Sequence, residues 1–160
     1  MDALFQTQSN ELSTTTQKEK LFKDAERQWN TLSTEKGAPG RKVDFEIYKS
    51  ILYNLEIRKV YLDSTLSLEK FSSIVGTNTT YLSNAVNNYF GCNFKRLINS
   101  YRVARAKELL DGKDCPVSEL FSRCGFASKS VFYVAFRKVV GMTPLQYISQ
   151  SRSPFMIQRN

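Results

Sequence analysis

The sequence predicts an all-α protein in which two helix-turn-helix subdomains are joined by a long central helix. Apolar residues recur three and four positions apart through most of the chain, and no segment shows the alternation of a β-strand. Glycines close several of these segments where a helix would end. The pattern occurs twice, with an offset of 49 to 50 residues, which indicates an internal repeat.

The length and charge of the chain favour a partner that carries many negative charges. With 160 residues, of which 41% are apolar, the chain can bury a core. Its net charge is +8, and the excess is local: residues 1–63 carry 10 basic and 10 acidic side chains, whereas residues 64–152 carry 12 and 5. A local positive excess suits a polyanion, although it also serves solubility.

Residues 1–40 are predicted to form a polar N-terminal segment with one amphipathic helix and a linker. Residues 1–16 are rich in Gln, Ser, Thr and Asn and are expected to be disordered or dependent on a partner. A helical pattern then runs to about Glu35, and the sequence GAPG at 37–40 interrupts it. The apolar positions of this helix are Leu21, Ala25, Trp29 and Leu32.

A longer helix is predicted for residues 41–63, leading into the basic half of the chain. Its apolar face is formed by Tyr48, Ile51, Leu52 and Leu55, with Val60 as a further candidate. The region 64–152 then contains the repeat, and residues 153–160 form a tail.

The first unit of the repeat is predicted at 64–92. Ser67 is a good N-cap for a helix that ends at Gly76. The buried stripe of that helix consists of Leu68, Phe71, Ile74 and Val75. A second helix at 78–90 places Leu82, Val86 and Phe90 on one stripe. Its other faces carry Thr, Ser and Asn, which are weak helix formers, so these side chains are expected to serve recognition rather than helix stability.

A linker helix is predicted for residues 93–112, with Asn93 as its cap and Gly112 as its end. The inward positions of this helix are predicted to be Phe94, Leu97, Ile98, Tyr101, Ala104, Leu109 and Leu110.

The second unit, at 113–152, repeats the scheme of the first. Equivalent positions are Gly76 and Gly125, Gly91 and Gly141, Leu82 and Phe132, Val86 and Phe136, and Phe90 and Val140. The second helix of this unit is predicted at 128–140. Thr143 then caps a final helix that has Pro144 at its first position.

Two such units favour binding to duplex DNA. The second helix of a helix-turn-helix can enter a major groove, where short hydroxyl and amide side chains reach base edges. The predicted linker helix spans roughly 27 Å, which suits the ~34 Å between successive major grooves. The alternative is a merely solvated face, because helix-turn-helix corners also occur in proteins that bind nothing.

Residues 64–149 resemble the DNA-binding region of the AraC family of transcriptional regulators. The resemblance is carried by LSLEKFSSIVGTNTTYLSNAVNNYFG, NFKRLINSYRVARAKELL and above all VSELFSRCGFASKSVFYVAFRKVVGMTPLQYI. It implies a monomeric reader of two successive major grooves, with helices 78–90 and 128–140 as the reading helices. It also implies control of transcription, by activation or by repression.

The resemblance implies candidate DNA contacts by position. The base-contact candidates are Thr80, Ser83, Asn84, Lys129, Ser130, Tyr133 and Val134. The phosphate candidates are Lys95, Arg96, Arg102, Arg137 and Lys138. Val134 is equally well explained as a partly buried filler, and Arg102 as a structural residue, since it lies among core positions. Two departures from the family pattern are Ile148, where an arginine often stands, and the absence of a cation from helix 78–90.

The expected partners are double-stranded DNA and RNA polymerase. Residues 17–36 are a candidate contact for a sensor domain or a second subunit, since residues 1–42 are too short to form a sensor domain. The chain is thus either a stand-alone regulator or the output end of a larger sensor. No cofactor or metal is expected. No apolar run approaches a membrane span, so no membrane contact is expected. Three cysteines, an odd number without a CxxC spacing, fit a reducing cytoplasm.

Three rival functions are weaker. An enzyme is disfavoured because the chain has no histidine and no glycine-rich phosphate loop. A thiol redox-responsive regulator would use Cys92, Cys115 or Cys124, although buried free cysteines are ordinary core residues. A helical protein-interaction adaptor would use an exposed apolar face. The residues of that face would be Leu21, Phe22 and Trp29.

Overall fold

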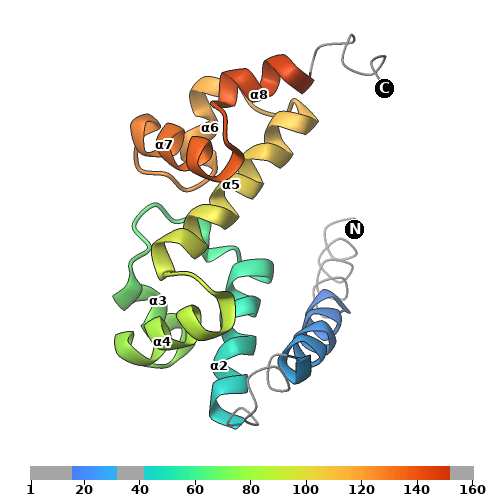
Figure 1. Cartoon of the computed structure of the whole chain (residues 1–160), viewed down its shortest axis with the longest axis vertical. Coiled ribbons are helices and arrows are strands. Elements are labelled where there is room, and N and C mark those ends of the chain that lie inside the picture. Colours follow the sequence, from blue (N-terminus) through green and yellow to red (C-terminus); the bar gives the residue numbers. More distant parts are fainter. Residues whose placement is uncertain (1–15, 32–41, 152–160) are drawn as a thin grey trace, which may run out of the picture. The chain divides into compact units, whose positions relative to one another are not determined.

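The computed structural model describes residues 16–31 and 42–151, and within these ranges the regular elements are all helical (Figure 1). The chain divides into two compact units. The first comprises Met1–Val60 and Ser67–Phe94, and the second comprises Tyr61–Leu66 and Lys95–Asn160. Because every regular element in the described residues is a helix, the predicted all-α class is confirmed. In the described part of the chain, no helix has the length and apolar character needed to cross a membrane.

The lead-in helix is shorter than the predicted range 41–63. It consists of α2 (Lys42–Leu52) and a π-helical turn, η1 (Tyr53–Ile57). Lys59 then takes a positive φ of 52°, and a separate 3-10 turn, η2 (Val60–Leu62), follows. The predicted buried residues of this helix are confirmed as Tyr48, Ile51, Leu52 and Leu55.

The π-turn η1 coincides with a side-chain hydrogen bond to the helix backbone. The side-chain amide of Asn54 donates to the carbonyl oxygen of Ser50 at 2.8 Å. That carbonyl is the acceptor that the backbone N–H of Asn54 would use in an α-helix. A side chain that occupies the acceptor competes with the regular ladder, and a π-turn accommodates it.

A helical segment at 16–31 belongs to the first unit and packs against it. Ala25 and Trp29 are buried in a cluster with Tyr48 and Leu52 of α2. The rival adaptor function, which needs an exposed apolar face, is therefore weakened, because Trp29 is buried by the chain's own residues and Leu21 and Phe22 are only partly exposed. The predictions for residues 1–15, the linker at 37–40 and the tail at 153–160 lie outside the described residues.

The first helix-turn-helix follows the prediction closely. It consists of α3 (Leu68–Val75) and α4 (Thr79–Phe90). The Ser67 hydroxyl accepts from the Lys70 N–H at 3.1 Å, and the Asn78 side chain caps α4 by accepting from the Tyr81 N–H at 2.8 Å. Gly76 has a φ of 88°, a left-handed conformation that glycine adopts at little cost, so it ends α3 as predicted.

The central helix, α5 (Phe94–Gly112), differs from the prediction in its buried face. Ala104 is exposed, whereas Val103 and Ala106 are fully buried. The reason is that Arg102 occupies an inward position between Ile98 and Ala106, so the buried stripe runs through a charged residue. The buried residues of α5 are Leu97, Ile98, Arg102, Val103, Ala106 and Leu109.

The end of α5 is also set differently from the prediction. Gly112 is the last helical residue, as its predicted position requires. However, the left-handed conformation falls on the next residue, Lys113, with a φ of 56°. The chain thus turns out of α5 without using the conformational freedom of the glycine.

The second unit repeats the first with a shorter opening helix. A 3-10 turn, η3 (Val117–Glu119), continues into the four-residue helix α6 (Leu120–Arg123), and α7 (Lys129–Val140) is the second helix. The final helix, α8 (Pro144–Ser151), begins with a capping box. In that box the Thr143 hydroxyl accepts from the Gln146 N–H at 3.2 Å, and the Gln146 side chain accepts from the Thr143 N–H at 3.0 Å.

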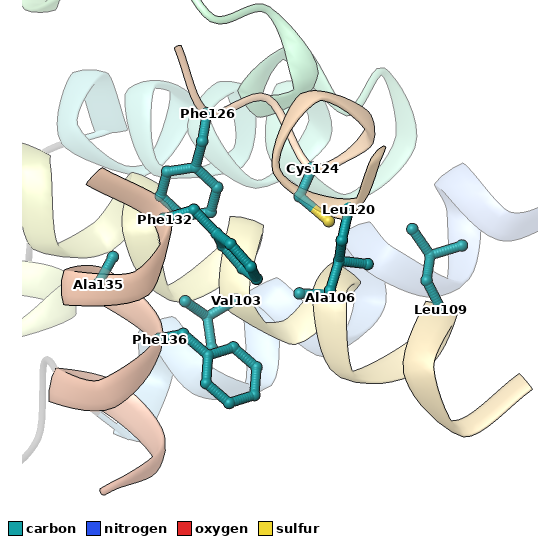
Figure 2. Close-up of a cluster of buried hydrophobic side chains, with 9 residues drawn as sticks. All are labelled: Val103, Ala106, Leu109, Leu120, Cys124, Phe126, Phe132, Ala135 and Phe136. Atoms are coloured by element: carbon teal, nitrogen blue, oxygen red, sulfur yellow. The ribbon is translucent and has the colours of Figure 1, made fainter. Parts of the chain in front are cut away.

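The core of the second unit lies between α5, α6 and α7. Figure 2 shows Phe132 and Phe136 of α7 directed toward Val103 of α5. The repeat predicts the burial of both aromatic residues, because they match Leu82 and Val86 of the first unit, which are also fully buried. The two units therefore bury equivalent faces of α4 and α7 and leave equivalent faces outward.

Candidate nucleic-acid interface

The outward face of α4 carries the candidates predicted for the first unit. Thr80 and Asn84 are exposed and Ser83 is partly buried, while Leu82 on the opposite side is fully buried. Neither the first nor the last turn of α4 contains a charged residue. This face therefore offers hydroxyl and amide groups, which can both donate to and accept from base edges.

The first turn of α4 is fixed to the lead-in helix. The hydroxyl of Tyr81 donates to the Asp44 carboxylate of α2 at 2.8 Å. The contact joins residues 37 positions apart and lies next to the Asn78 cap. Because α4 is held at its N-terminal end by both interactions, its outward side chains are presented by a rigid element.

The outward face of α7 is more varied. Lys129, Ser130 and Val134 are exposed, with 70% of Val134 accessible, so Val134 is not the buried filler that was one alternative. Tyr133 is partly buried and packs edge-on against Phe132, with ring centroids 5.7 Å apart. Tyr133 thus belongs partly to the core and is only partly available to a partner.

Sequence reasoning missed two exposed apolar residues on α7, Val131 and Val139. Val131 is 49% exposed and lies one helical turn before Val134. Its signal was present in the spacing, since residues three apart share a helix face. Val131 and Val134 together give this face of α7 an apolar component that the outward face of α4 lacks.

Four of the five predicted phosphate contacts lie exposed at the surface. Lys95 and Arg96 are exposed in the first turn of α5, and Arg137 and Lys138 are exposed in the last turn of α7. In the described part of the chain, Lys95, Arg137 and Lys138 form no salt bridge, whereas Arg96 has an interaction within the chain.

The fifth candidate, Arg102, is committed to the interior of the second unit. Its side chain is 9% exposed, Nε donates to the Tyr61 carbonyl at 2.8 Å, and Nη2 donates to the Asp63 carbonyl at 2.9 Å. Burial lowers the pKa of the guanidinium, and the nearby charge of Asp63 partly opposes that shift. The structure therefore favours the structural alternative for Arg102.

The cysteines differ in accessibility. All three are free thiols, with Cys124 fully buried and Cys92 and Cys115 partly buried. Burial, followed by the nearby Cys115, raises the pKa of the Cys124 thiol to about 12. Since the thiolate is the reactive form, Cys124 is poorly suited to redox chemistry at neutral pH.

Comparison with known proteins identifies the family to which this architecture is similar. A family model described as a helix-turn-helix domain matches residues 71–150, which is half of the chain. The HTH-type transcriptional activator RhaR of Enterobacter sp. (strain 638) is 32% identical over 91 residues, covering 57% of this chain and 32% of RhaR. The chain thus spans about a third of the length of this relative.

Solved structures agree with the family match. The C-terminal domain of AraT, a response regulator from Geobacillus stearothermophilus, is similar with a TM-score of 0.58 and 28% identity, covering 66% of this chain and 84% of that one. The DNA-binding domain of the global transcriptional factor AdpA, solved with a target DNA, shares the fold. Its TM-score is 0.60 at 20% identity, covering 67% of this chain and 93% of that one. The chain therefore belongs to the AraC-type helix-turn-helix family of DNA-binding transcriptional regulators.

Proposed function

We propose that the chain reads two successive major grooves of duplex DNA, with α4 in one groove and α7 in the other. The observation that carries this proposal is that both helices bury equivalent stripes and leave outward the faces that carry the predicted polar side chains. The 19 residues of α5 give a helix of roughly 28 Å, a length compatible with the ~34 Å between successive grooves.

The base contacts are assigned to the predicted residues of the two reading helices. On α4, the hydroxyls of Thr80 and Ser83 and the amide of Asn84 hydrogen-bond base edges. On α7, Lys129 and Ser130 provide the polar contacts, and Val134 packs on thymine methyl groups. The partly exposed Tyr133 completes the set.

The phosphate contacts are assigned to four exposed cations. These are Lys95, Arg96, Arg137 and Lys138. Arg102 is left out, because its donors are directed at backbone carbonyls of the protein. Within this scheme, residues 64–92 and 113–152 are the two reading units, and 93–112 is the linker helix between them.

The wider role is control of transcription in the cytoplasm, with RNA polymerase as a partner. This is supported by RhaR, which is a transcriptional activator. A sensor domain or a second subunit supplies the regulatory input. Because Trp29 is turned inward, such a partner would contact the polar outer side of the helix 16–31 rather than its apolar face. We infer no enzymatic activity and no cofactor.

The proposal is tested by selecting duplexes from a random DNA library with the full chain and then titrating salt. A two-groove reader should enrich a site with two conserved segments about one helical turn apart and lose affinity steeply as salt rises. Enrichment of no sequence, together with binding that is insensitive to salt, would instead support a protein-interaction adaptor.

A further inference from the structure

We propose that the helix 16–31 is a positioning element of the first reading unit, in which Trp29 holds the C-terminal end of α4 in the orientation needed for base readout. This inference rests on the proposed function. It assigns to a segment outside the matched family region 71–150 a role in sequence selectivity.

Trp29 sits at the centre of an aromatic cluster. Its ring centroid lies 4.7 Å from that of Tyr89, 5.5 Å from Phe45 and 5.6 Å from Tyr48. Tyr89 is in the last turn of α4, whereas Phe45 and Tyr48 are on α2. Trp29 therefore bridges the lead-in helix and the reading helix, and its side chain is only 7% exposed.

The last turn of α4 has further contacts with the same cluster. The ring of Tyr48 lies 5.4 Å from Phe90 and 6.0 Å from Tyr89 between centroids. The other end of α4 is held by Tyr81, which donates to Asp44. The reading helix is thus fixed at both ends, by a hydrogen bond at its start and by aromatic packing at its end.

The helix 16–31 is itself fastened along its length. The Tyr48 hydroxyl donates to the Gln28 side chain at 2.8 Å. The ammonium of Lys18 lies 4.9 Å from the ring centroid of Tyr53, and that of Lys49 lies 5.2 Å from the ring centroid of Phe22. Ala25 is buried between these contacts, so the helix packs against the first unit in one defined position.

The need for this support follows from the composition of α4. Its sequence, TTYLSNAVNNYF, is rich in Thr, Asn and Ser, which are weak helix formers, so the helix depends on tertiary packing for its order. Base readout requires side chains placed to within about half an ångström. Loosening the end of α4 that carries Tyr89 would therefore weaken the contacts of Ser83 and Asn84 but leave those of α7 intact.

The test uses the full chain and a duplex selected with it, together with two duplexes in which one or the other half-site is scrambled. The half-site read by α4 is identified as the one that Ser83→Ala/Asn84→Ala no longer distinguishes. Trp29→Ala should then weaken binding to the intact duplex about tenfold, the cost of one mismatched base pair, and remove discrimination at that half-site only.

Matched variants separate positioning from folding. Trp29→Phe keeps an aromatic ring and should restore discrimination, and Glu26→Ala, on the exposed side of the same helix, should change nothing. Ala25→Glu places a charge at a buried position and should detach the helix. It should therefore cause the same loss of discrimination as Trp29→Ala. Circular dichroism should show a loss of helical signal no larger than that of helix 16–31, so that α4 and the second unit remain folded in each variant.

The outcomes are distinguishable. If Trp29→Ala and Ala25→Glu both keep full discrimination at the half-site read by α4, the inference is wrong and the proposed function stands. Equal loss at both half-sites, or loss that follows loss of helicity, likewise overturns a positioning role. If Ser83→Ala/Asn84→Ala itself keeps all discrimination, the proposed function fails first.

Discussion

The guanidinium of Arg102 donates a 2.8 Å hydrogen bond to the carbonyl oxygen of Tyr61, 41 residues earlier in the chain. The ring of Phe126 covers its other side, with the guanidinium carbon 5.5 Å from the ring centroid. Through these contacts Arg102 binds the segment Tyr61–Leu66 into the second unit. Arg102, a candidate phosphate contact by its position in the sequence, thus stabilises the fold of the second unit.

Arg102→Ala should therefore lower the free energy of unfolding by about 3 kcal/mol, because two backbone carbonyls lose a charged donor and a cavity remains. Its effect on the salt dependence of DNA binding should be negligible. Lys95→Ala, on the exposed side of α5, should show the reverse pattern. Urea denaturation and salt titration of the two variants provide the comparison, and equal slopes with equal stabilities would contradict it.

Gly125→Ala should be more damaging than Gly76→Ala. Both glycines have a left-handed φ, 86° and 88° respectively, so alanine carries the same backbone cost of about 1 to 2 kcal/mol at each. At Gly125, however, an added Cβ would also collide with the Tyr61 carbonyl oxygen and approach the Leu62 Cα to 2.8 Å, whereas at Gly76 it meets nothing within 4 Å. Thermal unfolding should show the larger decrease for Gly125→Ala, and equal decreases would refute the close approach.

The buried Cys124 should make stability depend on pH in the alkaline range. Burial raises the thiol pKa from 9.0 to about 12. Above pH 9 the unfolded chain therefore releases a proton that the folded chain retains, so folding stability falls as pH rises, by at most about 1.4 kcal/mol per pH unit. The control is Cys124→Ala, which lacks this group. The stability difference between the two proteins should shrink from pH 8 to pH 10, and a constant difference would be the contrary result.

Arg137→Ala/Lys138→Ala should weaken binding to selected and random duplexes alike. Each lost phosphate contact should reduce the magnitude of the log–log salt slope by about 1, so the double variant should lose about 2. The same change removes favourable cations from the last turn of α7, at a cost in stability of about 1 kcal/mol. Fluorescence anisotropy over a salt series measures the slope. Loss confined to the selected duplex would mean that these side chains read bases.

The predictable part of this fold is the part set by local signals. Asn and Ser caps and left-handed glycines mark the bounds of α3, α4 and α7, and the apolar period identifies their buried faces. Exposure of Thr80 and Asn84 follows from the same period, which is why the outward face of α4 was predicted correctly.

The errors arise where tertiary contacts override local pattern. The acceptors that allow Arg102 to be buried lie 39 and 41 residues earlier, so the local pattern, which places Arg102 among core positions, does not identify them and assigns the inward position to Ala104. Trp29 is similar. Its helical spacing predicts burial, but its partners on α2 and α4 are distant in sequence and lie beyond the segment 32–41.

The central claim is that the polar face of α4 reads bases, and the most direct test is the affinity of Ser83→Ala/Asn84→Ala for a selected duplex and for the same duplex with one half-site scrambled. Alanine raises helix propensity at both positions, so the variant should remain folded. The account predicts a loss of about 1 to 3 kcal/mol per base contact on the selected duplex, no change on the scrambled one, and an unchanged salt slope. Unaltered affinity and selectivity would show that this face is merely solvated.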